Sequence, residues 1–187
     1  MRYIKLLLTS TLIAGLAGCT NIPVHQDYSG EQPLKNYATY QWLNTESLPT
    51  ENSSQQLKKQ QPFMAKRIET AILKNLHARE ALIVRNQPQA YIDYSYRVNR
   101  TEELEPSTTI GVGIGSGHVG FRGVFPISYE KRVYENAVWK VYIYNAQQQL
   151  IWHGSAEKPV KKFETPTEAQ AYTESIIDAI MAQYPPK

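Results

Sequence analysis

Apolar residues recur along the chain with two different periods, and each period predicts a different kind of element. After Pro62 the spacing is helical, which predicts an amphipathic helix of about four or five turns whose apolar stripe is Ala65, Ile68, Ile72 and Leu76. A second helix is predicted after Thr165, because residues 165–168 form a capping box with proline at the first helical position. Each helix has one apolar face, so each needs a sheet or a partner to cover it.

The strands are predicted mainly between these helices. Residues 90–98 alternate with a period of two, and residues 139–144 and 149–155 flank a short polar loop as a β-hairpin. An aromatic-rich strand is predicted at residues 37–43, before the first helix. The order predicts a two-layer α+β fold, with a mostly antiparallel sheet of four to five strands and two helices packed on one face.

The first nineteen residues predict where in the cell the protein is located. Arg2 and Lys5 form a short positive region before an apolar stretch that is too short to span a bilayer. The stretch ends in Leu-Ala-Gly-Cys at residues 16–19, which resembles the lipobox of bacterial lipoproteins. The resemblance implies cleavage between Gly18 and Cys19 and attachment of a diacylglycerol to the Cys19 thiol. The alternatives are an ordinary secretory signal with a stray cysteine and a buried N-terminal helix.

These features divide the chain into three parts. Residues 1–18 are expected to be a lipoprotein signal peptide, residues 19–36 a lipid-anchored tether, and residues 37–187 a single α+β domain. Thr20 stands where an Asp retention signal would follow the lipidated cysteine, and by resemblance this favours the outer membrane, with the periplasmic face as the default. Several acyl chains would make such attachment effectively permanent.

Charge and cysteine content exclude several functional classes. The formal net charge is +3, and removing residues 1–18 takes away Arg2 and Lys5 and reduces it to +1, which argues against a dedicated nucleic-acid binder. Cys19 is the only cysteine, so neither an intrachain disulfide nor a cysteine-rich metal site is possible. The histidines lack metal-ligand spacing, and no metal, cofactor or catalytic residue is expected.

Two further segments, one acidic and one rich in glycine, are candidate sites. Glu102, Glu103 and Glu105, beside a proline, are expected to form a solvated acidic loop. A glycine-rich segment lacks the Gly-Lys-Ser/Thr and the following helix of a phosphate loop. Its glycines alternate, leaving one face of a strand bare, which favours a structural hairpin and leaves open a surface for partner contact. The candidate contact residues are Gly111, Gly113, Gly115, Gly117 and His118.

Short segments spread over nearly all of the mature chain resemble the lipoprotein family called domain of unknown function 4136. These segments are residues 37–42 (YATYQW), 67–72 (RIETAI), 91–94 (YIDY), the glycine-rich middle, 150–156 (LIWHGSA) and 180–185 (IMAQYP). The chain departs from the family pattern at Tyr144-Asn145, where an acidic residue is usual, and at His153, where Arg is usual. The resemblance implies an envelope lipoprotein of α+β fold without an established activity.

Together these observations predict a non-enzymatic, lipid-anchored protein with an interaction or structural role in the assembly or maintenance of the cell envelope. Its expected partners are the membrane, through the N-terminal lipid, and an envelope protein. The alternative is a binding module for a lipid, glycan or other small envelope ligand. Tyr91, Tyr142 and Tyr144 lie at strand positions opposite the more apolar face, where they would serve recognition or simply favour the strand.

Overall fold

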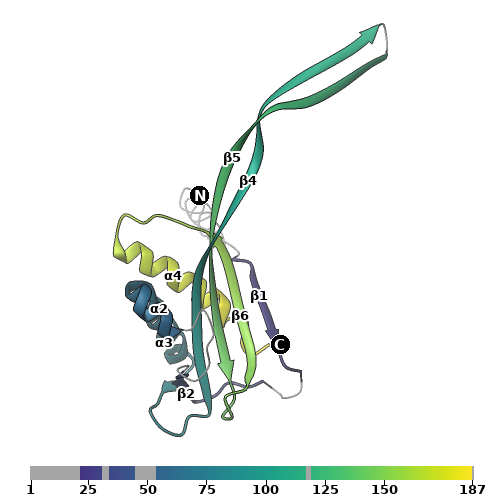
Figure 1. Cartoon of the computed structure of the whole chain (residues 1–187). Helices are drawn as coiled ribbons and strands as arrows, with labels where there is room; N and C mark the ends of the chain where they lie inside the picture. Colours follow the sequence, from purple (N-terminus) through teal and green to yellow (C-terminus); the bar gives the residue numbers. More distant parts are fainter. Residues whose placement is uncertain (1–21, 31–33, 45–53, 117–118, 187) are drawn as a thin grey trace, which may run out of the picture.

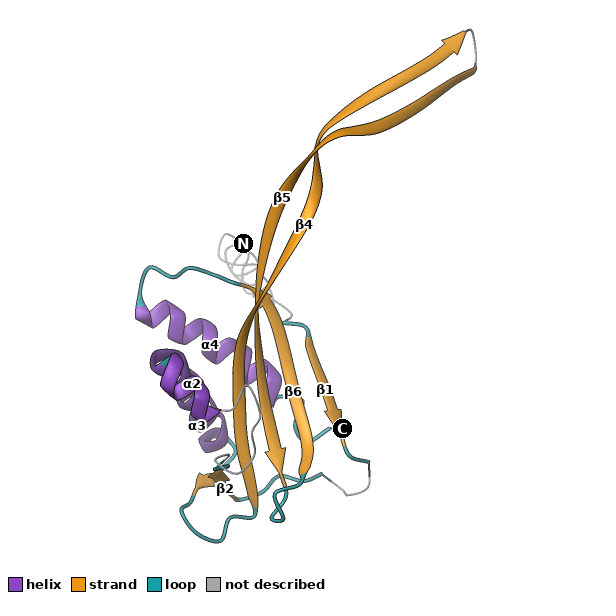
Figure 2. Cartoon of the chain, in the orientation of Figure 1, coloured by secondary structure: helices purple, strands orange, loops and turns teal. Residues whose placement is uncertain are grey.

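The computed structural model describes residues 22–30, 34–44, 54–116 and 119–186 (Figure 1). The predicted signal peptide and Cys19 lie outside this part of the chain, as do Gly117 and His118. Within it, a single sheet carries helices on one face, and one β-hairpin extends far beyond both layers (Figure 2).

The sheet has six strands in the order β1-β6-β5-β4-β2-β3. Their bounds are β1 Val24–Tyr28, β2 Thr39–Trp42, β3 Leu82–Ile83, β4 Ala90–Ser116, β5 Val119–Tyr144 and β6 Leu150–Pro159. The β1–β6, β6–β5 and β5–β4 pairs are antiparallel, whereas β2 pairs in parallel with both β3 and β4. The sheet is therefore mixed.

The two predicted helices are present. Helix α3 spans Pro62–Ala78 and starts on the predicted proline. Helix α4 spans Pro166–Met181, and the Glu168 backbone N–H donates to the Thr165 hydroxyl at 3.2 Å, as the capping box requires. At the other end of α4, the Arg79 guanidinium donates to the carbonyl oxygens of Met181 and Tyr184, which links the end of α3 to the end of α4.

The predicted fold was wrong in its numbers of strands and helices and in its largely antiparallel sheet. The described residues hold six strands and three helices, the third being α2 at Ser54–Gln60. Strands β1 and β3 are five and two residues long and are too polar or too short to show a period of two. Helix α2 was not predicted, because Leu57 is its only buried apolar residue and it therefore shows no apolar period.

The parallel pairs arise from the path of the chain through the helical layer. Strand β2 leads into α2 and α3, and the chain then returns to the same end of the sheet before β4 begins. Tyr40 consequently pairs with Ala90, and Trp42 with Ile92, in parallel register. A crossover through helices produces parallel neighbours, whereas a tight turn produces antiparallel ones.

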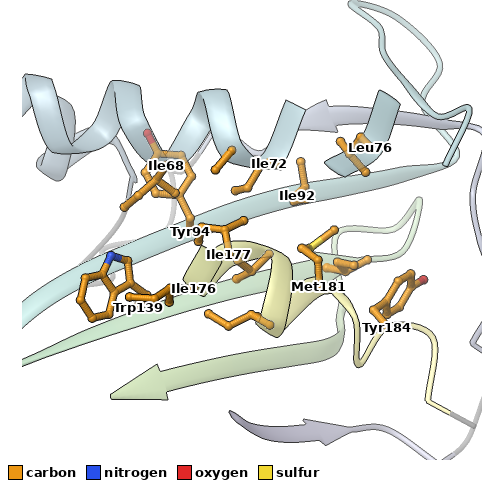
Figure 3. Close-up of a cluster of buried hydrophobic side chains, with 14 of the residues drawn as sticks. Ile68, Ile72, Leu76, Ile92, Tyr94, Trp139, Ile176, Ile177, Met181 and Tyr184 are labelled. Atoms are coloured by element: carbon orange, nitrogen blue, oxygen red, sulfur yellow. The ribbon is translucent and has the colours of Figure 1, made fainter. Parts of the chain in front are cut away.

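The core lies between α3, α4 and the central strands (Figure 3). Ile68, Ile72 and Leu76 of α3 and Ile176, Ile177 and Met181 of α4 are buried against Ile92, Tyr94, Val141 and Ile143 of the sheet. Trp152 and Tyr184 extend the core toward β1, with ring centroids 5.1 Å apart. Both predicted apolar stripes thus face the sheet.

Gly154 of β6 lets α4 approach the sheet closely. A Cβ atom at this position would lie 2.7 Å from Ile180 Cγ2 and 2.6 Å from Cη2 of the Trp152 ring. Both neighbours are fully buried, so neither can move away freely.

Gly154→Ala is expected to lower the free energy of unfolding by about 1–3 kcal/mol through overpacking. Chemical denaturation of the purified protein measures this change. Gly111→Ala is the control, because nothing lies within 4 Å of a Cβ at Gly111, and its effect should stay within about 0.5 kcal/mol. Equal effects of the two substitutions would contradict the proposed close approach.

Candidate interaction site

Strands β4 and β5 continue well past the other four strands. The last rung shared with β6 joins Asn136 to Pro159, and Asn136 pairs with Asn99 of β4. We define the arm as residues 100–116 and 119–135, which pair only with each other and project from one end of the sheet (Figure 1). At about 3.3 Å per residue, the arm is about 55 Å long.

The stem of the arm, residues 100–105 and 130–135, is held by charged side chains. Lys131 Nζ lies 2.5 Å from Glu102 Oε2, and Arg132 Nε lies 3.0 Å from Glu105 Oε2. Glu105 also accepts a hydrogen bond from the Tyr134 hydroxyl. The predicted acidic loop is therefore wrong: these glutamates lie on β4, paired with β5, and two of them form ion pairs with basic residues of β5.

The distal segment of the arm, residues 106–116 and 119–129, has a different composition. Arg122 is its only residue of the Asp, Glu, Lys and Arg types. Its described apolar side chains are largely exposed, with 68% of Val124, 60% of Phe125 and 57% of Ile127 accessible to solvent. An irregularity in register near Pro106 and Thr108 separates the distal segment from the stem.

The structure places three of the predicted contact glycines on the arm. Gly111, Gly113 and Gly115 lie in β4 and pair with Val124, Arg122 and Gly120 of β5. On the neighbouring strand, a Cβ at Gly123 would lie 2.9 Å from the Phe125 ring, so this glycine leaves room for that ring. The described glycines belong to a continuous two-stranded ribbon, as the predicted structural hairpin requires.

The arm has no second layer to cover it. Ile92 and Tyr94 in the body of the sheet are fully buried beneath the helices, whereas Leu104 and Phe125 in the arm are 72% and 60% exposed. An isolated two-stranded ribbon is only marginally stable in water, and its outer edges expose unpaired backbone groups. The arm is therefore an apolar surface that no other part of the described chain covers, and it is the best candidate for an interaction site.

A second group of polar residues lies on the sheet face opposite the core. The Ser95 and Tyr142 hydroxyls are 3.3 Å apart, and the ring centroid of Tyr142 lies 6.5 Å from that of Tyr144 and 6.1 Å from that of His153. Burial raises the pKa of the Tyr144 hydroxyl, and the nearby Asp93 carboxylate adds to the effect. Two of the three predicted strand tyrosines are thus brought together here.

Asp93 is the buried acid of this face, with only 4% of its surface exposed. Burial raises the pKa of its carboxyl group, while hydrogen bonding to Ser54 and the charge of Lys58 partly oppose the rise. Its Oδ1 atom has no hydrogen-bond partner. The sequence did not reveal this residue, because an acid at an alternate position of a strand usually faces solvent.

Two pockets lie in the body of the domain, by which we mean the described residues outside the arm. One, of about 210 Å³, is open to solvent and lined by Asp27, Trp152 and His153. The other, of about 110 Å³, lies between the helical layer and the base of the arm and is lined by Tyr96, Trp139, Phe163 and Tyr172. The Trp139 indole N–H has no hydrogen-bond partner and is buried in the wall of the second pocket.

The described histidines lie on three elements, two of which, β1 and β6, are neighbouring strands. His25 lies on β1, His77 on α3 and His153 on β6. No group of three His, Cys, Asp or Glu residues that could hold a metal ion occurs among the residues described by the structure. Within the same part of the chain, no helix is both long enough and apolar enough to cross a membrane.

These features define an α+β domain that carries a long, uncovered β-hairpin. A sequence model of the family described as domain of unknown function 4136 matches residues 24–186, and the chain belongs to this family. The family resemblance inferred from short sequence segments is thereby confirmed. No curated protein matches the chain.

The solved structures that align with the chain are distant from it in sequence. A PDZ domain protein from Parabacteroides distasonis aligns with a TM-score of 0.46 and 11% identity, over 89% of this chain and 36% of that one. A dodecamer of PelC from Paraburkholderia phytofirmans aligns with a TM-score of 0.42 and 12% identity, over 86% of this chain and 94% of that one. The chain therefore spans about a third of the first of these proteins.

Asp93→Asn is expected to raise the free energy of unfolding at neutral pH by about 1 kcal/mol, because the amide avoids burying a charge. The folded-state pKa lies above the unfolded-state value, so the protonated acid favours the fold at low pH and this stability is lost as the pH rises through the folded-state pKa. The increase in the free energy of unfolding of Asp93→Asn over the wild type should therefore shrink toward about pH 4. Denaturation at both pH values measures it.

The control for this experiment is Asp27→Asn on the exposed surface of β1. It should change stability by less than about 0.5 kcal/mol at either pH. A loss of stability in Asp93→Asn at neutral pH would contradict the assignment of an unfavourable buried charge.

Proposed function

We propose that the protein is a lipid-anchored periplasmic lipoprotein of the outer membrane, with a non-enzymatic interaction or structural role in the assembly or maintenance of the cell envelope. The observation that carries the interaction role is the arm, with its exposed Val124, Phe125 and Ile127 side chains. The anchoring rests on the lipobox at residues 16–19 and on the charge and length of the preceding segment.

The shape of the arm supports recognition in preference to catalysis. Residues of the Ile and Phe types bury surface on contact but provide no proton donor or nucleophile. The strands of the stem are linked by the Lys131–Glu102 and Arg132–Glu105 ion pairs, while the body supplies a folded base. Such an arrangement suits a protein that presents a surface at a distance from its own core.

The experiment that tests the anchoring is Cys19→Ala, expressed in a bacterium with an outer membrane. The wild-type chain is expected in the membrane fraction, with the mass of acyl groups on Cys19, because several buried acyl chains bind a bilayer almost irreversibly. The variant should lack that mass and shift largely out of the membrane fraction. Fractionation and mass spectrometry of the purified chains provide the two readouts.

Cys19→Ser is a matched variant, since serine replaces only the sulfur atom by oxygen and cannot form the thioether. It should behave like Cys19→Ala, while both chains keep the unfolding transition of the wild type. A wild-type chain purified without acyl groups would refute the anchoring.

The second candidate function is a binding module for a small envelope ligand, favoured by the unpartnered Trp139 N–H in the wall of the 110 Å³ pocket. Phe163 and Tyr172 supply apolar walls, and Lys161 Nζ lies 5.7 Å from the centroid of each ring. A ligand with an apolar group and a hydrogen-bond acceptor would match these neighbours.

The pocket is tested by measuring thermal unfolding in the presence of lipids and glycan fragments extracted from envelopes. A ligand should raise the melting temperature of the wild type and have less effect on Phe163→Ala, which removes one wall of the pocket. Leu150→Ala, an exposed change outside this pocket, is the control. Equal shifts in all three chains would place binding elsewhere.

A further inference from the structure

The start of the described chain and the base of the arm lie at the same end of the domain. Val24 pairs with Ala156, Ala156 pairs with Trp139, and Trp139 pairs with Tyr96, so these residues form one row across the sheet. Strand β1 runs away from the arm, and Ile22 therefore precedes this row on the side from which the arm projects (Figure 1). Ile22 also packs against the hydrophobic core.

The length of chain that precedes Ile22 limits how the domain can be oriented. Cys19 is three residues from Ile22, a distance of at most about 10 Å for an extended chain. The body of β4, residues 90–99, is about 30 Å long. If the arm pointed away from the bilayer, the body would lie between Ile22 and the membrane, and the short link could not span it.

When Cys19 carries lipid, the arm must therefore lie along the bilayer or at a shallow angle to it, because an arm pointing straight at the membrane would cross the hydrocarbon core. The arm's length of about 55 Å exceeds the reach of the link several times. Strand β1 shortens the free link. Residues 24–28 were expected to belong to the tether, but they pair with β6 and so belong to the sheet. The free link is consequently much shorter than the sequence suggested.

The chemistry of the arm changes along its length in the way a membrane contact requires. The stem carries ion pairs, which favour water or the headgroup layer. Beyond them, Ile110, Val124, Phe125 and Ile127 are exposed apolar residues, and Tyr129 is exposed at the boundary. Aromatic and aliphatic side chains in this order match the boundary between headgroups and acyl chains.

We infer that the distal segment of the arm docks on the bilayer that holds the Cys19 lipid, with both faces of the ribbon, Val124 on one and the Ile110–Phe125 pair on the other, within its interfacial layer. This inference rests on the proposed anchoring. The outer edges of the arm place it at the interface, because their unpaired backbone groups keep hydrogen bonds to water there and would lose them in the hydrocarbon core. The ligand is thus the lipid surface itself.

The test uses the full mature chain, reconstituted in vesicles of phosphatidylethanolamine and phosphatidylglycerol. Val124→Cys introduces the only reactive thiol, since the Cys19 thiol is occupied by its lipid, and a polarity-sensitive fluorophore is attached there. We expect nitroxide-bearing lipids to quench this label several-fold more strongly than the same label at Leu150→Cys. Leu150 is exposed at the start of β6, at the end of the sheet remote from the arm.

Ile110→Cys supplies a second labelled position on β4, where Ile110 pairs with Phe125 of β5. It should also be quenched by nitroxide lipids and protected from iodide in the water phase, whereas the label at residue 150 should remain open to iodide. Because these side chains are exposed, labelling leaves the core intact, and an unchanged unfolding transition verifies this.

The outcomes separate this inference from the proposed anchoring. An acylated chain whose label at residue 124 is as open to iodide as the label at residue 150 would overturn the docking and leave the anchor intact. Protection from iodide without quenching by nitroxide lipids would also overturn it, since a second copy or another protein would then cover the arm. A chain without acyl mass on Cys19 would refute the anchoring and, with it, the premise of the docking.

Discussion

The antiparallel pairing of β4 with β5 is the interaction on which the rest of the structure depends. The two strands pair with each other from Tyr91 and Tyr144 to Ser116 and Val119, with one irregularity in register near Thr108. Its first part forms the centre of the sheet, to which β6 and β2 add on either side and on which the helices pack. Its second part is the arm. The core and the candidate interaction site therefore share one hydrogen-bonded ribbon, and the orientation of the arm is determined by the body.

The two parts of the ladder differ in what covers them. Tyr94 and Ile92 are buried by α3 and α4, so apolar burial stabilises this region. In the arm, stabilisation comes from backbone hydrogen bonds and from cross-strand ion pairs such as Arg132–Glu105, each of which contributes modestly in water. The arm thus combines an extended shape with exposed apolar groups, and the pairing of β1 with β6 places Ile22 near its base.

Local signals in the sequence predicted those elements whose apolar residues face a core. The stripe from Ala65 to Leu76 and the capping box at Thr165 predicted α3 and α4 because regular burial produces regular spacing. Strand β1, helix α2 and the stem carried no such signal. Glu102 and Glu105 resembled a solvated loop, since their partners Lys131 and Arg132 lie almost thirty residues away. The buried Asp93 was missed because an acid at an alternate position of a strand usually faces solvent.

By itself, the sequence determined the family, the two long helices, the central strands and a lipobox that predicts an anchor at Cys19, because each of these depends on neighbouring residues or on a simple period. Only the tertiary structure decided that β2 joins the sheet in parallel, that the glycine-rich segment extends a ribbon from the core, and that Ile22 lies at the base of that ribbon. These features depend on contacts between residues remote in the chain, and no local pattern records which strands will meet.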